Sequence, residues 1–123
     1  MTMSIRLTMV VLTVLLLARP AYAQNGAIGS WEMTTVSPEG TFVSQMEIRQ
    51  TGEKLVAVAR GERGEREYDS VAVDGSRITL VLTISYNGSP MTITYRGEIN
   101  GTAMTGDADF GGMASGGWSA ERK

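Results

Sequence analysis

From residue 28 onward, apolar and polar residues alternate along almost the whole chain. The longest run, 78–86, places Ile, Leu and Tyr on one face and Thr, Val and Ser on the other. Alternation in short runs rich in Thr, Val, Ile and Tyr indicates strands with one buried face. No stretch after the first 23 residues shows a helical period. Four further runs repeat the alternation: 42–49, 55–60, 91–98 and 104–110.

Turn signals separate these runs at regular intervals. They lie at residues 37–40, 51–52, 61–64, 74–75, 87–88, 100–101 and 111–117. Asp-Gly and Asn-Gly pairs supply the positive φ angles that two-residue hairpin turns need. Short connections make consecutive strands antiparallel neighbours, and closing the sheet removes its exposed edges. The sequence therefore predicts an all-β fold, an eight-stranded antiparallel up-and-down β-barrel, with an open or sandwiched sheet as the alternative.

The N-terminal segment has the layout of a secretory signal peptide. A short basic start leads into an uncharged run at 7–18, and small residues precede a cleavage site before Gln24. The apolar run is shorter than the ~20 residues that span a bilayer. We therefore expect a signal peptide at 1–23 and a single barrel domain at 24–123. The protein would be exported, periplasmic or extracellular, with no membrane span after cleavage.

Composition removes several classes of chemistry. The chain has no His and no Cys, which excludes disulfides, thiolate nucleophiles and imidazole bases or metal ligands. A net charge of −2 gives no basic surface for nucleic acid. Asp107 and Asp109 could open an EF-hand loop, but Trp118 stands where that loop needs an acid. We therefore expect no catalytic residues, metal, cofactor or nucleic-acid partner. An enzyme using a carboxylate pair is the least favoured hypothesis, because no acid interrupts the main apolar stripes.

Two features resemble the calycin group, which includes lipocalins, fatty-acid-binding proteins and avidins. The first strand begins Gly29-Ser30-Trp31, and the last strand ends with Arg122. The resemblance implies that Arg122 packs over Trp31 and closes one end of the barrel, with Gly29 opening the first strand.

Most of the chain after the signal also resembles a small bacterial exported β domain. That domain occurs alone or at the C-terminus of exported amidohydrolases, and its function is undefined. The resemblance is carried by QTGEKL, VDGSRITL, MTITYRGEINGTAMTG and GGWSAERK. It implies an accessory or standalone barrel and transfers no catalytic residue to this chain.

The barrel interior is expected to be either filled or hollowed into a small apolar pocket, since eight strands enclose only side chains or one small ligand. Bulky residues such as Phe42, Leu80 and Met104 would crowd the interior, while Ala57 and Gly106 leave room on one sector. Tyr86, Tyr95 and Trp118 are the aromatics expected at the mouth. The candidate ligand-binding residues are Trp31, Met46, Leu82, Tyr86, Tyr95 and Trp118.

These features predict a non-enzymatic, monomeric binding or accessory module that holds a small hydrophobic ligand or binds an exported protein partner. The alternative is a protein-interaction module, such as a periplasmic protease inhibitor or an accessory subunit of an exported hydrolase. Its binding surface would lie in loops, of which the Gly-rich segment Gly111 to Gly117 is the long one.

Overall fold

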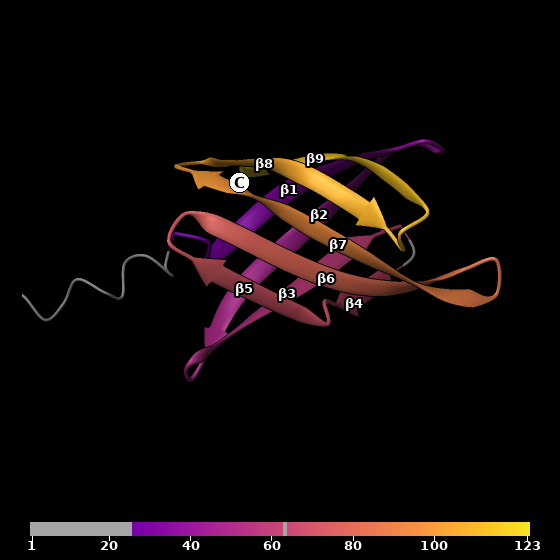
Figure 1. Ribbon diagram of the computed structural model, residues 1–123. Coiled ribbons are helices and arrows are strands. Elements are labelled where there is room, and N and C mark those ends of the chain that lie inside the picture. The colour runs from indigo at the N-terminus through magenta and orange to yellow at the C-terminus, as the bar shows by residue number, and fades with distance from the viewer. Residues whose placement is uncertain (1–25, 63) are drawn as a thin grey trace, which may run out of the picture.

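A computed structural model describes residues 26–62 and 64–123, which form one antiparallel sheet of nine strands (Figure 1). The predicted signal peptide at 1–23 lies outside the described residues. Along the sheet the strand order is β4-β3-β2-β1-β9-β8-β7-β6-β5. The strands are β1 (Gly29–Ser37), β2 (Gly40–Thr51), β3 (Lys54–Gly61), β4 (Gly64–Glu67), β5 (Ser70–Asp74), β6 (Arg77–Tyr86), β7 (Ser89–Asn100), β8 (Ala103–Phe110) and β9 (Ala114–Arg122).

The period-two stripes face the inside of the curled sheet. Along β6, Ile78, Leu80 and Leu82 are buried, while the residues between them are more exposed. Trp31 on β1 lies opposite Met46 on β2, and both are buried in the same core. The β-structure and the single core predicted from the alternation are confirmed. Within the described ranges, no helix is long and apolar enough to cross a membrane.

The structure has nine strands where the sequence predicts eight, because the segment between the turns at 61–64 and 74–75 is divided. Its first half, β4, pairs with β3, and its second half, β5, pairs with β6. At the break, the Tyr68 N–H donates to Ala57 O (2.8 Å) and the Asp69 N–H donates to Val81 O (2.7 Å). Consecutive residues thus bond to opposite neighbours, and the chain changes partners there.

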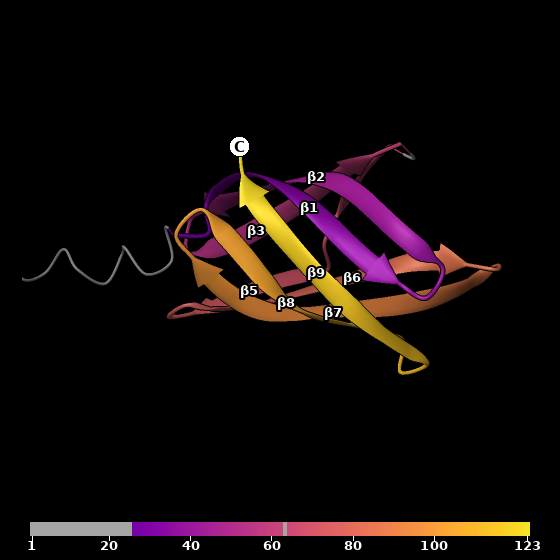
Figure 2. The ribbon, with the colours of Figure 1, turned by 90° about the horizontal axis from the view of Figure 1, so that it is seen from above.

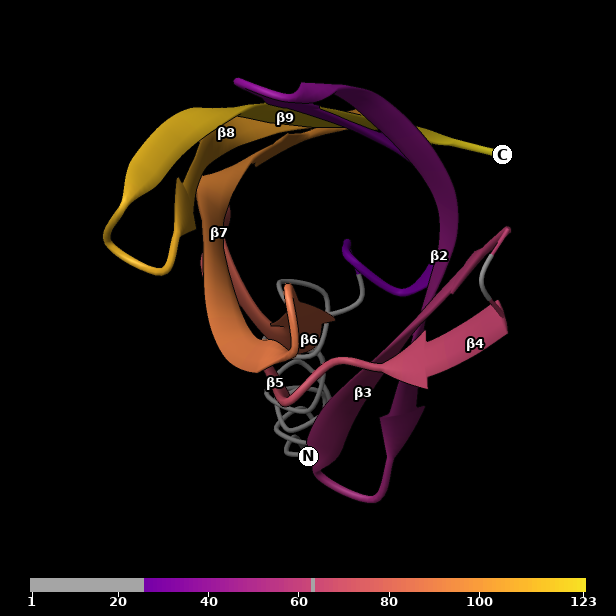
Figure 3. The same cartoon turned by 90° about the vertical axis from the view of Figure 1, so that its right-hand side faces the viewer.

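The sheet curls into a barrel shape without closing its ladder, so the prediction of a fully closed ring is corrected (Figure 3). β4 and β5 are its two end strands, and β3 and β5 lie beside each other without pairing. On the β4 side of the break at Tyr68 and Asp69, Arg66 donates from Nη1 to the Thr83 carbonyl of β6 (2.9 Å). Single contacts, rather than a continuous ladder, therefore connect the two ends of the sheet.

A row of two glycines and a tryptophan lets three strands approach closely. Gly97 on β7 lies opposite Gly106 on β8, which lies opposite Trp118 on β9. A Cβ on Gly106 would lie 1.9 Å from the Arg96 carbonyl oxygen, and one on Gly97 would lie 2.7 Å from the Trp118 ring. Trp118 covers the Gly97 backbone and donates its indole N–H to Arg96 O (3.2 Å). The absence of side chains at Gly97 and Gly106 is therefore required for this close approach of the strands.

Candidate functional site

Large apolar side chains occupy the interior of the barrel. Tyr68, Tyr95 and Trp118 form a chain of edge-to-face rings, with centroid distances of 6.3 Å and 5.9 Å. The Tyr68 hydroxyl donates to Met33 Sδ (3.3 Å), so this buried polar group has a partner. The largest fully buried side chains are Trp31, Met33, Met46, Ile48, Ile78, Leu80 and Met104. This packing favours the filled interior of the two alternatives left open by the sequence.

Burial changes the acid–base behaviour of the interior tyrosines. It raises the pKa of Tyr68 far above the ordinary value of 10.0, with a smaller contribution from Tyr95. Burial also raises the pKa of Tyr95, partly offset by a hydrogen bond with Thr35. Above pH ~10 the unfolded chain ionises these phenols while the folded chain keeps them protonated. The folded state then binds more protons, so stability falls as pH rises.

We expect the free energy of unfolding to fall above pH ~10 by about 1.4 kcal/mol per pH unit for each buried tyrosine. Thermal melting between about pH 9 and pH 11, with phenolate absorbance followed in parallel, checks this. Tyr86, which is accessible, should titrate in the folded protein. Tyr68→Phe should reduce the loss of stability with pH. Ionisation of all the tyrosines with the fold intact would contradict the burial described.

One end of the barrel, which we call the base, is closed by the residues that precede β1. Arg122 donates from Nη1 to Ile28 O (2.8 Å) and from Nη2 to Gly26 O (2.6 Å). Its guanidinium lies 4.3 Å from the centroid of the Trp31 ring, and the Trp31 N–H donates to Ala27 O (2.9 Å). Figure 3 shows this segment turning inward across the ring of strands.

Gly29 contributes to the base through its missing side chain. A Cβ there would lie 2.6 Å from Arg122 Nη1, and its φ of +138° disfavours other residues. The structure thus brings together Gly29, Trp31 and Arg122, the residues that the calycin resemblance assigns to closure.

The opposite end, which we call the mouth, carries the turns β1–β2, β3–β4, β6–β7 and β8–β9 (Figure 2). Within the described residues, all large exposed hydrophobic side chains lie at this end: Val36 (50%), Phe42 (56%), Val43 (56%) and Met113 (73%). A groove of about 280 Å³ runs between the β6–β7 and β8–β9 turns, lined chiefly by Tyr86, Pro90, Met91 and Met113. The base turns carry polar residues instead, such as Glu53, Asp74 and Arg77.

The Tyr86 side chain makes a contact across the mouth. The Tyr86 hydroxyl at the end of β6 donates to Glu39 Oε2 in the β1–β2 turn, although these strands are far apart in the sheet order. The hydrogen bond and negative charge of Glu39 raise the pKa of Tyr86. Tyr86 therefore both lines the groove and holds the β1–β2 hairpin near it.

The six residues proposed for ligand binding fall into two groups. Trp31, Met46, Leu82, Tyr95 and Trp118 are buried core residues, and only Tyr86 lines the mouth groove. The expectation that Tyr95 and Trp118 lie at the mouth is therefore wrong, because their rings pack against Tyr68 and Gly97 inside the barrel.

Two other sequence-based expectations about this end are corrected. Phe42 shares the inner face with Met46, but it lies near the start of β2, beyond the packed core, and is 56% exposed. The segment Gly111 to Gly117 is not a long loop, because β9 begins at Ala114 and pairs with both β1 and β8. Alternation indicates which face a residue occupies but not how far along the barrel the packing extends. Sequence reasoning also missed Met91 and Met113 as mouth residues.

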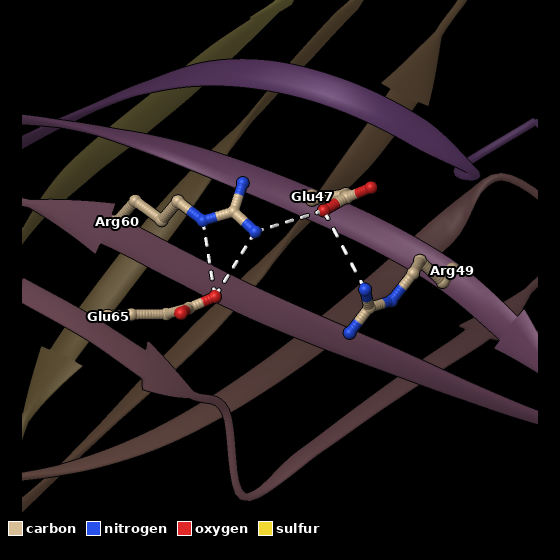
Figure 4. A network of polar contacts seen from close by, with 4 residues as sticks. All are labelled: Glu47, Arg49, Arg60 and Glu65. Carbon is tan, nitrogen blue, oxygen red and sulfur yellow. Dashed lines mark hydrogen bonds and ion pairs between the residues drawn. The ribbon is translucent and has the colours of Figure 1, made fainter.

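Charged groups lie on the outside of the barrel. Figure 4 shows Arg60 between Glu65 (3.1 Å) and Glu47 (3.5 Å), with Arg49 on the far side of Glu47 (3.9 Å). Glu47 lies opposite Val58 of β3, which is buried although it is on the outer face. Among the described residues, Thr35 is the only buried polar residue apart from the tyrosines and tryptophans, and no cluster of acids could hold a metal ion.

No protein-family model matches the chain, and no curated protein matches it either. A solved structure described as a redesigned β-barrel is similar over 82% of this chain and 95% of its own, with a TM-score of 0.66 and 16% sequence identity. At that identity the similarity concerns the fold alone, and it supports the description of a small β-barrel.

Proposed function

We propose that the protein is an exported, non-enzymatic binding module that takes a small hydrophobic ligand at the mouth of the barrel. The observation that carries this proposal is the concentration of exposed apolar side chains at one end, beside a groove of about 280 Å³. Exposed apolar side chains that gather at one place, rather than lie scattered, are typical of binding sites. The filled interior argues for a ligand seated on the mouth rather than deep inside.

The closed base supports a ligand site at the opposite end of the barrel, the mouth. Arg122 holds the residues before β1 across the base, so a ligand would enter and leave at the mouth. This arrangement also supports the finer proposal of a calycin-like barrel, in which a last-strand arginine covers a first-strand tryptophan. Export rests on the signal-peptide pattern at 1–23, which would deliver a domain of residues 24–123.

The non-enzymatic part of the proposal is supported by where the acids lie. The described carboxylates are on the outer face or in turns, and several are held in ion pairs with arginine. Catalysis by a carboxylate pair needs two acids that face each other across a cleft. The mouth groove is lined instead by hydroxyl, thioether and aromatic side chains.

Phe42 and Val43 provide a matched test, because they are adjacent, equally exposed at 56%, and point to opposite faces of β2. We expect Phe42→Ser to weaken binding of the apolar fluorophore 1-N-phenylnaphthylamine by about tenfold, part of the ~1.5–3 kcal/mol that burying a Phe contributes. Val43→Ser should leave the affinity unchanged. Fluorescence titration measures both, with melting temperatures as the folding control. Equal binding by both variants and wild type would exclude the inner rim of the mouth as the site.

A protein partner is the second candidate, favoured by Val36 and Val43 on the outer face of the β1–β2 hairpin. This reading predicts the reverse ranking of the variants. Val43→Ser would lose an exported partner captured from periplasm, while Phe42→Ser would retain it. Native mass spectrometry of protein purified from its own periplasm would distinguish a retained small molecule from a stoichiometric protein.

A further inference from the structure

The methionine side chains of the barrel fall into two sets that differ in their access to solvent. Met33, Met46 and Met104 are at most 1% exposed, whereas Met113 in the β8–β9 turn is 73% exposed. Met91 on β7 is partly exposed, and together with Met113 it lines the mouth groove. We call Met91 and Met113 the mouth methionines. A reagent dissolved in water can therefore reach these two side chains without entering the barrel.

The three interior methionines are shielded by the core around them. Met33 Sδ accepts a hydrogen bond from the Tyr68 hydroxyl (3.3 Å), so this sulfur atom has a lone pair already engaged. Met46 lies opposite Trp31, and both belong with Met104 to the buried core. A reagent can attack these sulfur atoms only when the barrel opens, and core strands open rarely.

Met91 lies against the β8–β9 turn, which carries Met113. A Cβ on Gly111 would lie 3.0 Å from Met91 Cγ and 3.8 Å from its Sδ, so the thioether is next to the glycine backbone. The Gly111 N–H donates to Thr92 O (2.8 Å), which holds the turn beside β7. The two mouth methionines therefore border one groove, Met91 from β7 and Met113 from the turn.

Oxidation of a thioether by a peroxide changes an apolar group into a polar one. The sulfur lone pair forms an S–O bond as the O–O bond of hydrogen peroxide breaks, and the products are a sulfoxide and one molecule of water. Covering the sulfoxide with an apolar ligand would remove water from a strong hydrogen-bond acceptor, which costs free energy. The chain has no Cys, the other side chain that such oxidants attack readily. Oxidation of the mouth methionines therefore opposes binding of an apolar ligand in the groove.

We propose that Met91 and Met113 form a reversible oxidation site, at which peroxide converts the mouth from a surface that binds an apolar ligand into one that releases it. This inference rests on the proposed function, because it concerns the same groove. A methionine sulfoxide reductase reverses the step: two thiols become a disulfide, the oxygen leaves as water and the thioether is restored. Export would place the protein outside the reducing cytosol, so the site couples ligand release to oxidising conditions.

The test follows oxidation and binding in the same samples of purified protein, treated with increasing amounts of hydrogen peroxide. Peptide mass spectrometry identifies which methionines are oxidised, and fluorescence titration measures the affinity for 1-N-phenylnaphthylamine. We expect the mouth methionines to oxidise at least about tenfold faster than the three interior ones. The affinity should fall about fivefold or more once both are sulfoxides. Methionine sulfoxide reductases with dithiothreitol should restore it, and the chain has no disulfide for that reductant to break.

The control is a protein with both Met91→Leu and Met113→Leu, which keeps apolar side chains at the mouth but has no sulfur there. Each protein is compared with its own untreated sample, so an effect of the substitutions on the starting affinity cancels. The same peroxide treatment should not change the affinity of this variant, and far-ultraviolet circular dichroism should show both proteins still folded.

Three results would overturn the inference alone. The interior methionines could oxidise as fast as the mouth methionines, the wild-type protein could keep its affinity with both mouth methionines oxidised, or the doubly substituted protein could lose as much affinity as the wild type. Unfolding on oxidation of the mouth methionines would overturn it as well, because the lost affinity would then be a loss of structure. An untreated protein that fails to bind the fluorophore would instead overturn the proposed function, and this inference with it.

Discussion

Replacing Trp31 with alanine is expected to lower the free energy of unfolding by about 3–5 kcal/mol. Trp31 is fully buried, its indole N–H donates to Ala27 O, and the Arg122 guanidinium lies over its ring. Truncation would leave a cavity at the base and remove the surface on which Arg122 rests. Chemical denaturation of the wild-type and variant proteins measures the loss directly.

Arg122 provides the matched comparison for this prediction. Arg122→Lys keeps the charge but loses the planar group that donates to both Ile28 O and Gly26 O, so it should recover only part of the stability lost in Arg122→Ala. If the Trp31→Ala protein were as stable as the wild type, Trp31 would not contribute to base closure. If the wild-type, Arg122→Lys and Arg122→Ala proteins were equally stable, Arg122 would not contribute to base closure.

Replacing Gly106 with alanine is expected to cost about 3 kcal/mol or more, which is near the upper end for overpacking a core. The new Cβ would lie 1.9 Å from the Arg96 carbonyl oxygen and 2.5 Å from the Gly97 Cα. Both are backbone atoms, so no side-chain rotation relieves the overlap and β7 would have to move away from β8. Denaturant unfolding gives the size of the effect, and near-ultraviolet circular dichroism reports whether Trp118 keeps its packing.

Gly117 is the control, because it lies on the neighbouring strand and has room for a methyl group. A Cβ there would approach the Gly106 carbonyl oxygen only to 3.7 Å, an ordinary contact. Gly117→Ala should therefore leave stability unchanged or raise it slightly. If Gly106→Ala and Gly117→Ala proved equally stable, β7 and β8 would not approach as closely as described.

The fold was largely predictable from local patterns. Stripes such as Ile78, Leu80 and Leu82 fix which face is buried, and pairs such as Asn100-Gly101 fix where the chain reverses. The strand break at Tyr68 and Asp69 was not predictable in this way. It depends on two hydrogen bonds to different neighbours, β3 and β6, which no local pattern records.

The candidate site was less predictable than the fold. Sequence alternation assigned Phe42 and Tyr95 alike to the inner face, although one is exposed at the mouth and the other is packed in the core. The difference arises from position along the barrel axis, which depends on strand register and tilt. From the sequence, Gly106 was expected to leave room on one sector of the interior, whereas in the structure Gly97 and Gly106 allow the close approach of neighbouring backbones.

Methionine methyl groups provide the most direct test of where a ligand binds. Of the five methionines in the described residues, Met33, Met46 and Met104 are buried in the interior, while Met91 and Met113 line the mouth groove. In a protein labelled with [methyl-¹³C]methionine, addition of 1-N-phenylnaphthylamine should shift the Met91 and Met113 signals and leave the other three in place. Shifts of Met33, Met46 and Met104 with no change at Met91 and Met113 would contradict the proposal, because the ligand would then occupy the interior.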